Sequence, residues 1–343
     1  MTLQFLATEW LIILFIVSGI AIWIAGVKLT IALDRITKFY NIGEAMGGMI
    51  FLAIVTNLPE IAITGIASWY GNVDIAVSNI LGGIAIQTVV LAFIDYFGVG
   101  KAGPLSHKSS SVGLLLEGII VILILSLVIV GKEVQPDFTI LNGSLVEWII
   151  LLVWITGIYL IYKNPHINTR KQKIAEDKLR ASEPKITKKQ AINAILLFSI
   201  LAVITLASGL TLELCSETLA KRFSISNALF GATFLALITA LPEISSGIES
   251  AKLKDYQMAV SDIFGGNAFL PVLLLMGSMF LGKPAINSVN NTDIYLTALS
   301  IILTGIFMIG LIIKSPKQLF RLGFDSLTLI IIYIVGIIGL MLI

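Results

Sequence analysis

Side chains that bind soft metals are nearly missing from this chain of 343 residues. It has one cysteine, Cys215, and two histidines, His107 and His166, both in segments predicted to be loops. One cysteine excludes an intramolecular disulfide and a cysteine metal cluster, and two separated loop histidines argue against a histidine-rich metal site. The first apolar run lacks a basic start and a small-residue cleavage site, so we predict a first membrane span rather than a removable signal peptide.

Charge is also scarce, because only 13% of the residues are charged while 57% are hydrophobic. Soluble domains average about 25% charged and roughly 45–50% apolar residues. Apolar segments of about 20 residues recur along the chain, each long enough to cross a bilayer. The composition therefore predicts an all-α polytopic membrane protein whose surroundings are the lipid bilayer, and no feature indicates nucleic acid or an obligatory protein partner.

Hydropathy predicts about ten transmembrane helices. They lie near residues 10–33, 41–69, 73–98, 112–131, 144–163, 190–212, 224–251, 257–281, 292–313 and 325–343. Nineteen of the 23 Lys and Arg residues lie in the loops that follow the odd-numbered spans. The positive-inside rule makes these loops cytoplasmic and both termini extracytoplasmic, and we expect the plasma (cell) membrane as the location.

The longest loop, residues 164–189, is polar and basic, and we predict a cytoplasmic linker with some affinity for anionic lipid headgroups. It separates two groups of five spans, residues 1–163 and 190–343. An odd number of spans makes the second group enter the membrane with the opposite polarity. The predicted fold is therefore two inverted five-helix repeats.

An internal repeat supports this division. A shift of 183 residues superposes "GMIFLAIVTNLPEIAI", which starts at Gly48, on "GATFLALITALPEISS", which starts at Gly231. Without a gap, "AVSNILGGIA" then superposes on "AVSDIFGGNA". Inverted repeats of this kind place a substrate site at broken helices near the middle of the membrane, and alternating access follows from motion around that site.

The repeated motif combines a proline and a carboxylate at membrane depth. Pro59 and Pro242 have no amide hydrogen, so each leaves the carbonyl four residues earlier without its helical donor. Glu60 and Glu243 follow directly, although a charge at the centre of a membrane helix costs about 2.5–3.5 kcal/mol on insertion scales. Two such acids facing each other indicate a cation between them.

Carboxylates, threonine hydroxyls and freed carbonyls are hard oxygen donors. Ca²⁺ accepts six to eight such oxygens in flexible geometry, whereas Mg²⁺ requires a strict octahedron and keeps its waters. Copper(I) prefers sulfur, which the motif lacks. For Asp262 an interfacial or ion-paired role fits the sequence equally well. We expect the cation site to draw on Thr56, Asn57, Glu60, Asn79, Gln87, Thr239, Glu243, Asp262 and Asn267.

Four other acids fall near the predicted ends of spans. Glu117 and Glu147 begin spans, and Asp95 and Glu249 lie near cytoplasmic ends with lysines close by in the sequence. We predict that these four lie at the interface or pair with lysine.

At these motifs the sequence resembles the calcium/cation antiporter superfamily, specifically its sodium/calcium exchanger branch. The resemblance implies paired alpha repeats, here residues 47–93 and 230–276, with the cores "VTNLPE" and "ITALPE" followed by "LGGIAIQ" and "FGGNAFL". It implies that Glu60 and Glu243, with the backbone of Thr56 and Thr239, bind calcium. Serines of the family pattern are replaced by Asn57, Ala240, Gly83 and Gly266, and one later polar position by Leu270. The resemblance therefore implies a divalent-cation site and leaves the coupling ion open.

The leading hypothesis is a secondary-active antiporter that exchanges Ca²⁺ for a monovalent cation, with Na⁺ favoured. The alternatives are an H⁺-coupled antiporter for Ca²⁺ or another divalent ion, since carboxylates also bind protons, and a cation channel or uniporter. A membrane scaffold is a further alternative. An enzyme is not expected, because no Ser–His set, histidine metal motif or pair of aspartates on facing spans is present. No cofactor is expected either, and Ca²⁺, Na⁺ or H⁺ would be transported substrates.

Overall fold

The computed structural model describes residues 3–40, 51–134, 138–163, 186–224, 230 and 234–340. Its first half contains α1 (Thr8–Tyr40), α3 (Ala53–Thr56), α4 (Leu58–Trp69), α5 (Val73–Phe93), α6 (Leu105–Ser109), α7 (Val112–Val134) and α8 (Leu145–Lys163). The second half contains α10 (Lys188–Arg222), α12 (Ala236–Thr239), α13 (Leu241–Lys252), α14 (Tyr256–Phe269), α15 (Leu273–Leu281), α16 (Asn291–Ile313) and α17 (Phe324–Leu340). Most of the predicted linker, residues 164–185, lies outside the described part of the chain.

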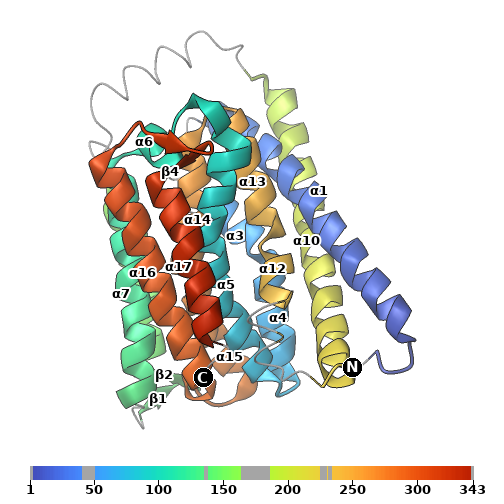
Figure 1. Ribbon diagram of the computed structural model, residues 1–343. Helices are drawn as coiled ribbons and strands as arrows, with labels where there is room; N and C mark the ends of the chain where they lie inside the picture. Colours follow the sequence, from blue (N-terminus) through green and yellow to red (C-terminus); the bar gives the residue numbers. More distant parts are fainter. Residues whose placement is uncertain are drawn as a thin grey trace.

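The helices form a bundle whose members run lengthwise (Figure 1). Within the described ranges, seven helical segments are long and apolar enough to cross a bilayer. The shorter α17 and two interrupted segments, α3–α4 and α12–α13, complete a set that matches the predicted number of about ten spans. The prediction of an all-α polytopic membrane protein is confirmed.

Two segments occupy the centre of the bundle. In their most apolar stretches, 94% of the residues of Val73–Ala102 and 72% of Tyr256–Leu281 are buried, against 22% for α8 and 28% for α10. Thus α5 and α14 are surrounded by protein, while the outer helices present isoleucine, leucine and valine to the lipid. Polar side chains on α5 and α14 therefore lie inside the bundle.

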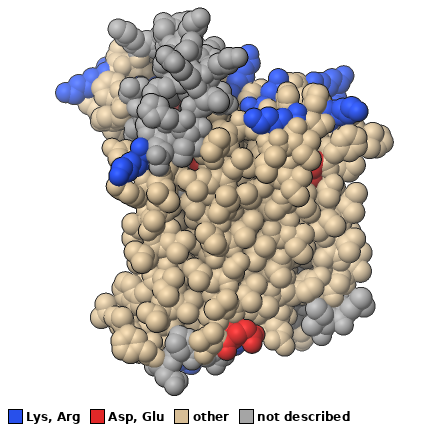
Figure 2. Space-filling model, turned by 90° about the vertical axis from the view of Figure 1, so that its left-hand side faces the viewer, with Lys and Arg blue, Asp and Glu red and all other residues tan. Residues whose placement is uncertain are grey.

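The surface has the charge distribution of a membrane protein. Figure 2 shows a broad belt without charged side chains, with most of the visible Lys and Arg gathered at one end. Around α6 and the strands β3 (Gln318–Leu319) and β4 (Leu322–Gly323), which lie at that end, the exposed basic residues include Lys101, Lys108, Lys317 and Arg321. This is the end that the sequence predicts to be cytoplasmic.

Two short hairpins mark opposite ends of the bundle. β1 (Thr139–Ile140) pairs with β2 (Gly143–Ser144) just before α8, and β3 pairs with β4 just before α17. Figure 1 places the first hairpin at the lower end and β4 at the upper end. This arrangement is expected when two similar five-helix groups cross the membrane with opposite polarity.

Three of the four acids predicted at the interface are buried and bonded inside the protein. Glu147 accepts hydrogen bonds from the backbone N–H groups of Ser144 (2.9 Å) and Ile286 (2.9 Å), and Asp95 accepts them from Leu105 and Gly323 (both 2.7 Å). Glu147 thus connects the β1–β2 hairpin to the segment around Ile286, and Asp95 connects the β3–β4 hairpin to α6.

Glu117 is the third, 1% exposed and hydrogen-bonded to Ser261 on α14 (2.9 Å). The prediction for these three acids was wrong, because hydropathy does not reveal which face of a helix meets protein. The prediction was right for Glu249, which pairs with Lys252 at 3.8 Å.

Each proline of the repeated motif packs against a glycine of an outer helix. A Cβ atom on Gly209 of α10 would lie 2.5 Å from the Cα atom of Pro59, and one on Gly26 of α1 would lie 3.0 Å from the Cα atom of Pro242. The two glycines are separated by 183 residues, the same shift that superposes the motifs. The sequence repeat therefore has a counterpart in the packing of the two halves.

We predict that Gly209→Ala destabilises the protein by about 1–3 kcal/mol, because a methyl group would press on the backbone of α4. The measurement is the melting temperature of the purified protein in detergent. Gly305→Ala on α16 is the matched control, because a Cβ atom there meets nothing within 4 Å. Equal melting temperatures for the two variants would contradict the described contact.

Candidate cation-binding site

The two prolines begin new helices rather than kinking continuous ones. Asn57 separates α3 from α4, and Ala240 separates α12 from α13. Pro59 and Pro242 are the second residues of α4 and α13, a position where a missing N–H leaves no helical hydrogen bond unmade. The interruption lasts one residue, since the N–H of Asn57 still donates to the carbonyl of Ala53 at 3.2 Å.

At each interruption, the N–H groups that begin one helix carry positive partial charge, and the C=O groups that end the preceding helix carry negative partial charge. Glu60 and Glu243 lie in the first turns of α4 and α13, where exposed N–H groups stabilise a carboxylate. The carbonyl oxygens of a helix point toward its C-terminal end, so those of the turns that end at Thr56 and Thr239 point toward the two interruptions. Each half therefore supplies one carboxylate and one set of carbonyl oxygens.

The two glutamates are buried without a basic partner. Glu60 is 1% exposed and Glu243 is 0% exposed, and the two carboxyls lie within electrostatic reach of each other. The Oε2 atom of each has no hydrogen-bond partner among the described residues. No described Lys, Arg or His forms an ion pair with either. Buried carboxylates in this state are stabilised by a bound cation or by protonation.

Each threonine of the motif faces the glutamate of the other half. The hydroxyl of Thr56 lies within interaction distance of the Glu243 carboxyl, and the hydroxyl of Thr239 within interaction distance of the Glu60 carboxyl. All four side chains are at most 1% exposed. The oxygen donors of this candidate site therefore come from both halves of the chain.

The same two threonines also reach the central helices. Thr56 donates to Oδ1 of Asp262 at 3.1 Å, and Thr239 donates to Oδ1 of Asn79 at 3.4 Å. Asn79 and Asp262 are matching positions of the repeat, one an amide and the other a carboxylate. Asp262 accepts a second hydrogen bond from Ser246. Sequence analysis missed Ser246, although its position three residues after Glu243 puts it on the same face of α13.

Asn57 and Gln87 fill one flank of the glutamate pair. The amide nitrogen of Gln87 lies 3.3 Å from Oδ1 of Asn57 and 3.3 Å from Oε1 of Glu243. Asn57 itself donates to the carbonyl of Ala53 at 2.6 Å. A Cβ atom on Gly266 would lie only 2.7 Å from the Asn57 amide nitrogen, so glycine there permits close packing.

The matching flank in the other half is open. Ala240 and Leu270 take the places of Asn57 and Gln87, and neither can donate a side-chain hydrogen bond. A Cβ atom on Gly83 would meet no atom within 4 Å. Glycine therefore permits close packing at position 266, whereas position 83 has open space where a Cβ atom would lie.

Eight of the nine predicted site residues are joined by these contacts, and Asn267 is not. Asn267 donates to the hydroxyl of Thr88 at 3.0 Å, and no recorded contact within the described ranges links it to the other eight. The described residues also contain no group of three or more Asp, Glu, His or Cys side chains arranged as a metal cluster. A cation here would be bound by carboxylates together with hydroxyl, amide and carbonyl oxygens.

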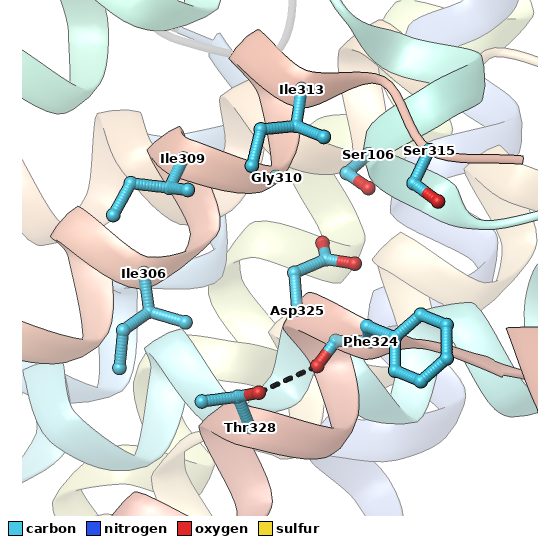
Figure 3. A pocket seen from close by; sticks show the side chains of 9 residues that line it. All are labelled: Ser106, Ile306, Ile309, Gly310, Ile313, Ser315, Phe324, Asp325 and Thr328. Carbon is cyan, nitrogen blue, oxygen red and sulfur yellow. Dashed lines mark hydrogen bonds between the residues drawn. The ribbon is translucent and has the colours of Figure 1, made fainter. Parts of the chain in front are cut away.

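A cavity of about 290 Å³ lies apart from this site, between α16 and α17 with Ser106 of α6 at its wall. Figure 3 shows Asp325 directed into it between isoleucines of α16 and the side chain of Phe324. None of the nine predicted residues lines it. The glutamate pair is therefore separate from this cavity.

An apolar helix bundle with two interrupted helices and unpaired carboxylates at its centre defines an integral membrane protein with a candidate internal cation site. The chain belongs to the sodium/calcium exchanger family, because the model of the sodium/calcium exchanger protein family matches residues 10–167 and 192–342.

Curated relatives are similar over most of their length. The chain is 24% identical over 268 residues to the putative antiporter CaxA of Alkalimonas amylolytica, covering 77% of this chain and 78% of that protein. It is 22% identical over 281 residues to the inner membrane protein YrbG of Escherichia coli strain K12, covering 82% and 81%.

Solved structures of the sodium–calcium exchanger NCX_Mj share the fold. One, soaked with 10 mM Na⁺ and 10 mM Sr²⁺, has a TM-score of 0.59 and 20% sequence identity and covers 97% of this chain and 99% of that one. Another, soaked with Na⁺ and Ca²⁺, has a TM-score of 0.58 and 19% identity. The resemblance to the exchanger family is thereby confirmed at the level of family and fold.

We predict that Glu60→Gln and Glu243→Gln each lower the affinity for Ca²⁺ by roughly 100-fold or more, because each removes one of two facing buried charges. Equilibrium binding of radioactive Ca²⁺ to purified protein measures this. Glu249→Gln on α13 is the matched control, because that carboxylate pairs with Lys252 away from the site, and its affinity should equal that of the wild type. Unchanged binding in both site variants would contradict the assignment.

Proposed function

We propose that the protein is a secondary-active antiporter that exchanges Ca²⁺ for a monovalent cation by alternating access. The observation that carries the proposal is the pair Glu60 and Glu243, buried and close together without a basic partner among the described residues. A divalent cation neutralises both charges at once, and two monovalent cations would do the same. Both kinds of ion therefore compete for one site.

The ligand chemistry supports Ca²⁺ as the divalent substrate. The hydroxyls of Thr56 and Thr239 lie beside the carboxylates, and carbonyl oxygens at the ends of α3 and α12 would complete a set of hard donors. Membership of the sodium/calcium exchanger family and the Na⁺, Ca²⁺ and Sr²⁺ soaks of NCX_Mj support the same choice, with Na⁺ as the counter-ion. H⁺ coupling is the second candidate, because Gly83 and Ala240 contribute no side-chain oxygen.

The interrupted helices also support alternating access over a static pore. Each threonine contributes to the other half's glutamate, so separating the halves on either side of the site would expose it to that side. The protein would then act as a transporter rather than as an enzyme or a scaffold.

We predict that liposomes containing the protein take up Ca²⁺ when an outward Na⁺ gradient is imposed and that uptake stops in Glu60→Gln. A parallel preparation with an outward H⁺ gradient tests the second candidate, because only the true counter-ion should drive accumulation. A Ca²⁺-sensitive dye inside the liposomes records the flux. Ca²⁺ entry that ignores both gradients would contradict antiport and favour a uniporter.

We further propose that the basic end of the bundle is cytoplasmic and that both termini are extracytoplasmic, in the plasma membrane. A cysteine placed at the exposed Lys283 should react with a membrane-impermeant maleimide in intact cells, whereas one at the exposed Lys108 should react only after lysis. The native Cys215 is buried and serves as the unlabelled background. The reverse labelling pattern would overturn the orientation.

A further inference from the structure

Asp262 is a third buried carboxylate beside the glutamate pair. It is 0% exposed and lies within electrostatic reach of Glu243. Like the glutamates, it forms no ion pair with a Lys, Arg or His in the part of the chain that the structure describes. Its partners are the hydroxyls of Thr56 and Ser246, which carry no charge.

The surroundings of Asp262 are rich in oxygen. The hydroxyl of Thr56 lies 3.1 Å from its Oδ1 atom and 3.0 Å from the carbonyl oxygen of Leu52. The hydroxyl of Ser246 contacts its Oδ2 atom and lies 3.3 Å from the carbonyl oxygen of Glu243. Oε2 of Glu243, on a fully buried side chain, has no hydrogen-bond partner among the described residues. These oxygens would suit an alkali cation, which needs hard donors and little net charge.

The charges do not balance with a divalent ion alone. Three ionised carboxylates carry three negative charges, and Ca²⁺ between Glu60 and Glu243 neutralises two of them. One negative charge would remain in a low-dielectric interior, where an uncompensated ion is strongly disfavoured. A single additional monovalent cation next to Asp262 would remove this imbalance, as would a proton on its carboxyl, and the Na⁺-binding experiment separates the two.

We propose that Asp262, with Thr56 and Ser246, forms a monovalent-cation subsite that is occupied together with Ca²⁺. This inference rests on the proposed function. It adds that the protein carries one monovalent cation together with Ca²⁺ in the Ca²⁺-transporting step of the cycle. The subsite exists in one half only, because the matching residue of the first half is Asn79, an uncharged amide.

The test is binding of radioactive ²²Na⁺ to purified protein while Ca²⁺ saturates the glutamate pair. The wild type should retain about one Na⁺ per chain, and Asp262→Asn should lower Na⁺ affinity about tenfold or more while Ca²⁺ still binds. Asparagine is the residue that the repeat itself has at position 79, so the variant should fold. Its melting temperature checks this.

Asn79→Asp combined with Asp262→Asn is the matched variant, since it moves the third charge to the other half, where Ile63 takes the place of Ser246, and it should restore Na⁺ binding only in part. Absence of Na⁺ from the Ca²⁺-saturated wild type would overturn the inference whether or not the variants fold. Equal Na⁺ binding in wild type and Asp262→Asn would also overturn it. The liposome exchange assay is run in parallel, because loss of gradient-driven Ca²⁺ uptake in the wild type would reject the proposed function separately.

Discussion

The structure depends on one electrostatic constraint, which is that negative charges buried in an apolar bundle must be compensated. Glu60 and Glu243 have no basic partner in the described part of the chain. Their negative charges must therefore be neutralised by something other than a basic side chain of the described residues. The backbone does part of this task, because each glutamate lies in the first turn of a helix that begins next to it. The remainder would come from a bound cation or a proton, and this requirement connects the fold to the proposed ion transport.

The glutamates and threonines of the candidate site are divided evenly between the two halves. Each threonine contacts the glutamate of the opposite half, and each outer glycine packs on a proline of the opposite half. A rearrangement of one half relative to the other would therefore alter the proposed ligands of the cation. In the proposed site, binding would be coupled to conformation through these contacts.

Much of the fold could be predicted from the sequence because lipid imposes simple rules. Apolar segments of sufficient length indicate spans, and the shift of 183 residues that aligns Glu60 with Glu243 identified the residues that the structure brings together. The packing of individual helix faces could not be predicted in this way. Glu117 and Asp95 lie in segments that hydropathy places near the interface, yet both face protein, and only the tertiary structure shows that. Gly83 and Gly266 look equivalent in the repeat, but their neighbours differ because Asn57 is matched by Ala240.

This last difference limits how the chain can vary. The amide of Asn57 occupies the space into which a side chain at position 266 would extend, so a residue larger than glycine at 266 requires either a shift of that amide or a smaller residue at 57. Position 83 has no such restriction, because its surroundings are open. Sequences of this type should therefore show paired substitutions at 57 and 266 and independent ones at 83. Equivalent positions in the two similar halves would therefore accept different side chains, because their steric surroundings differ.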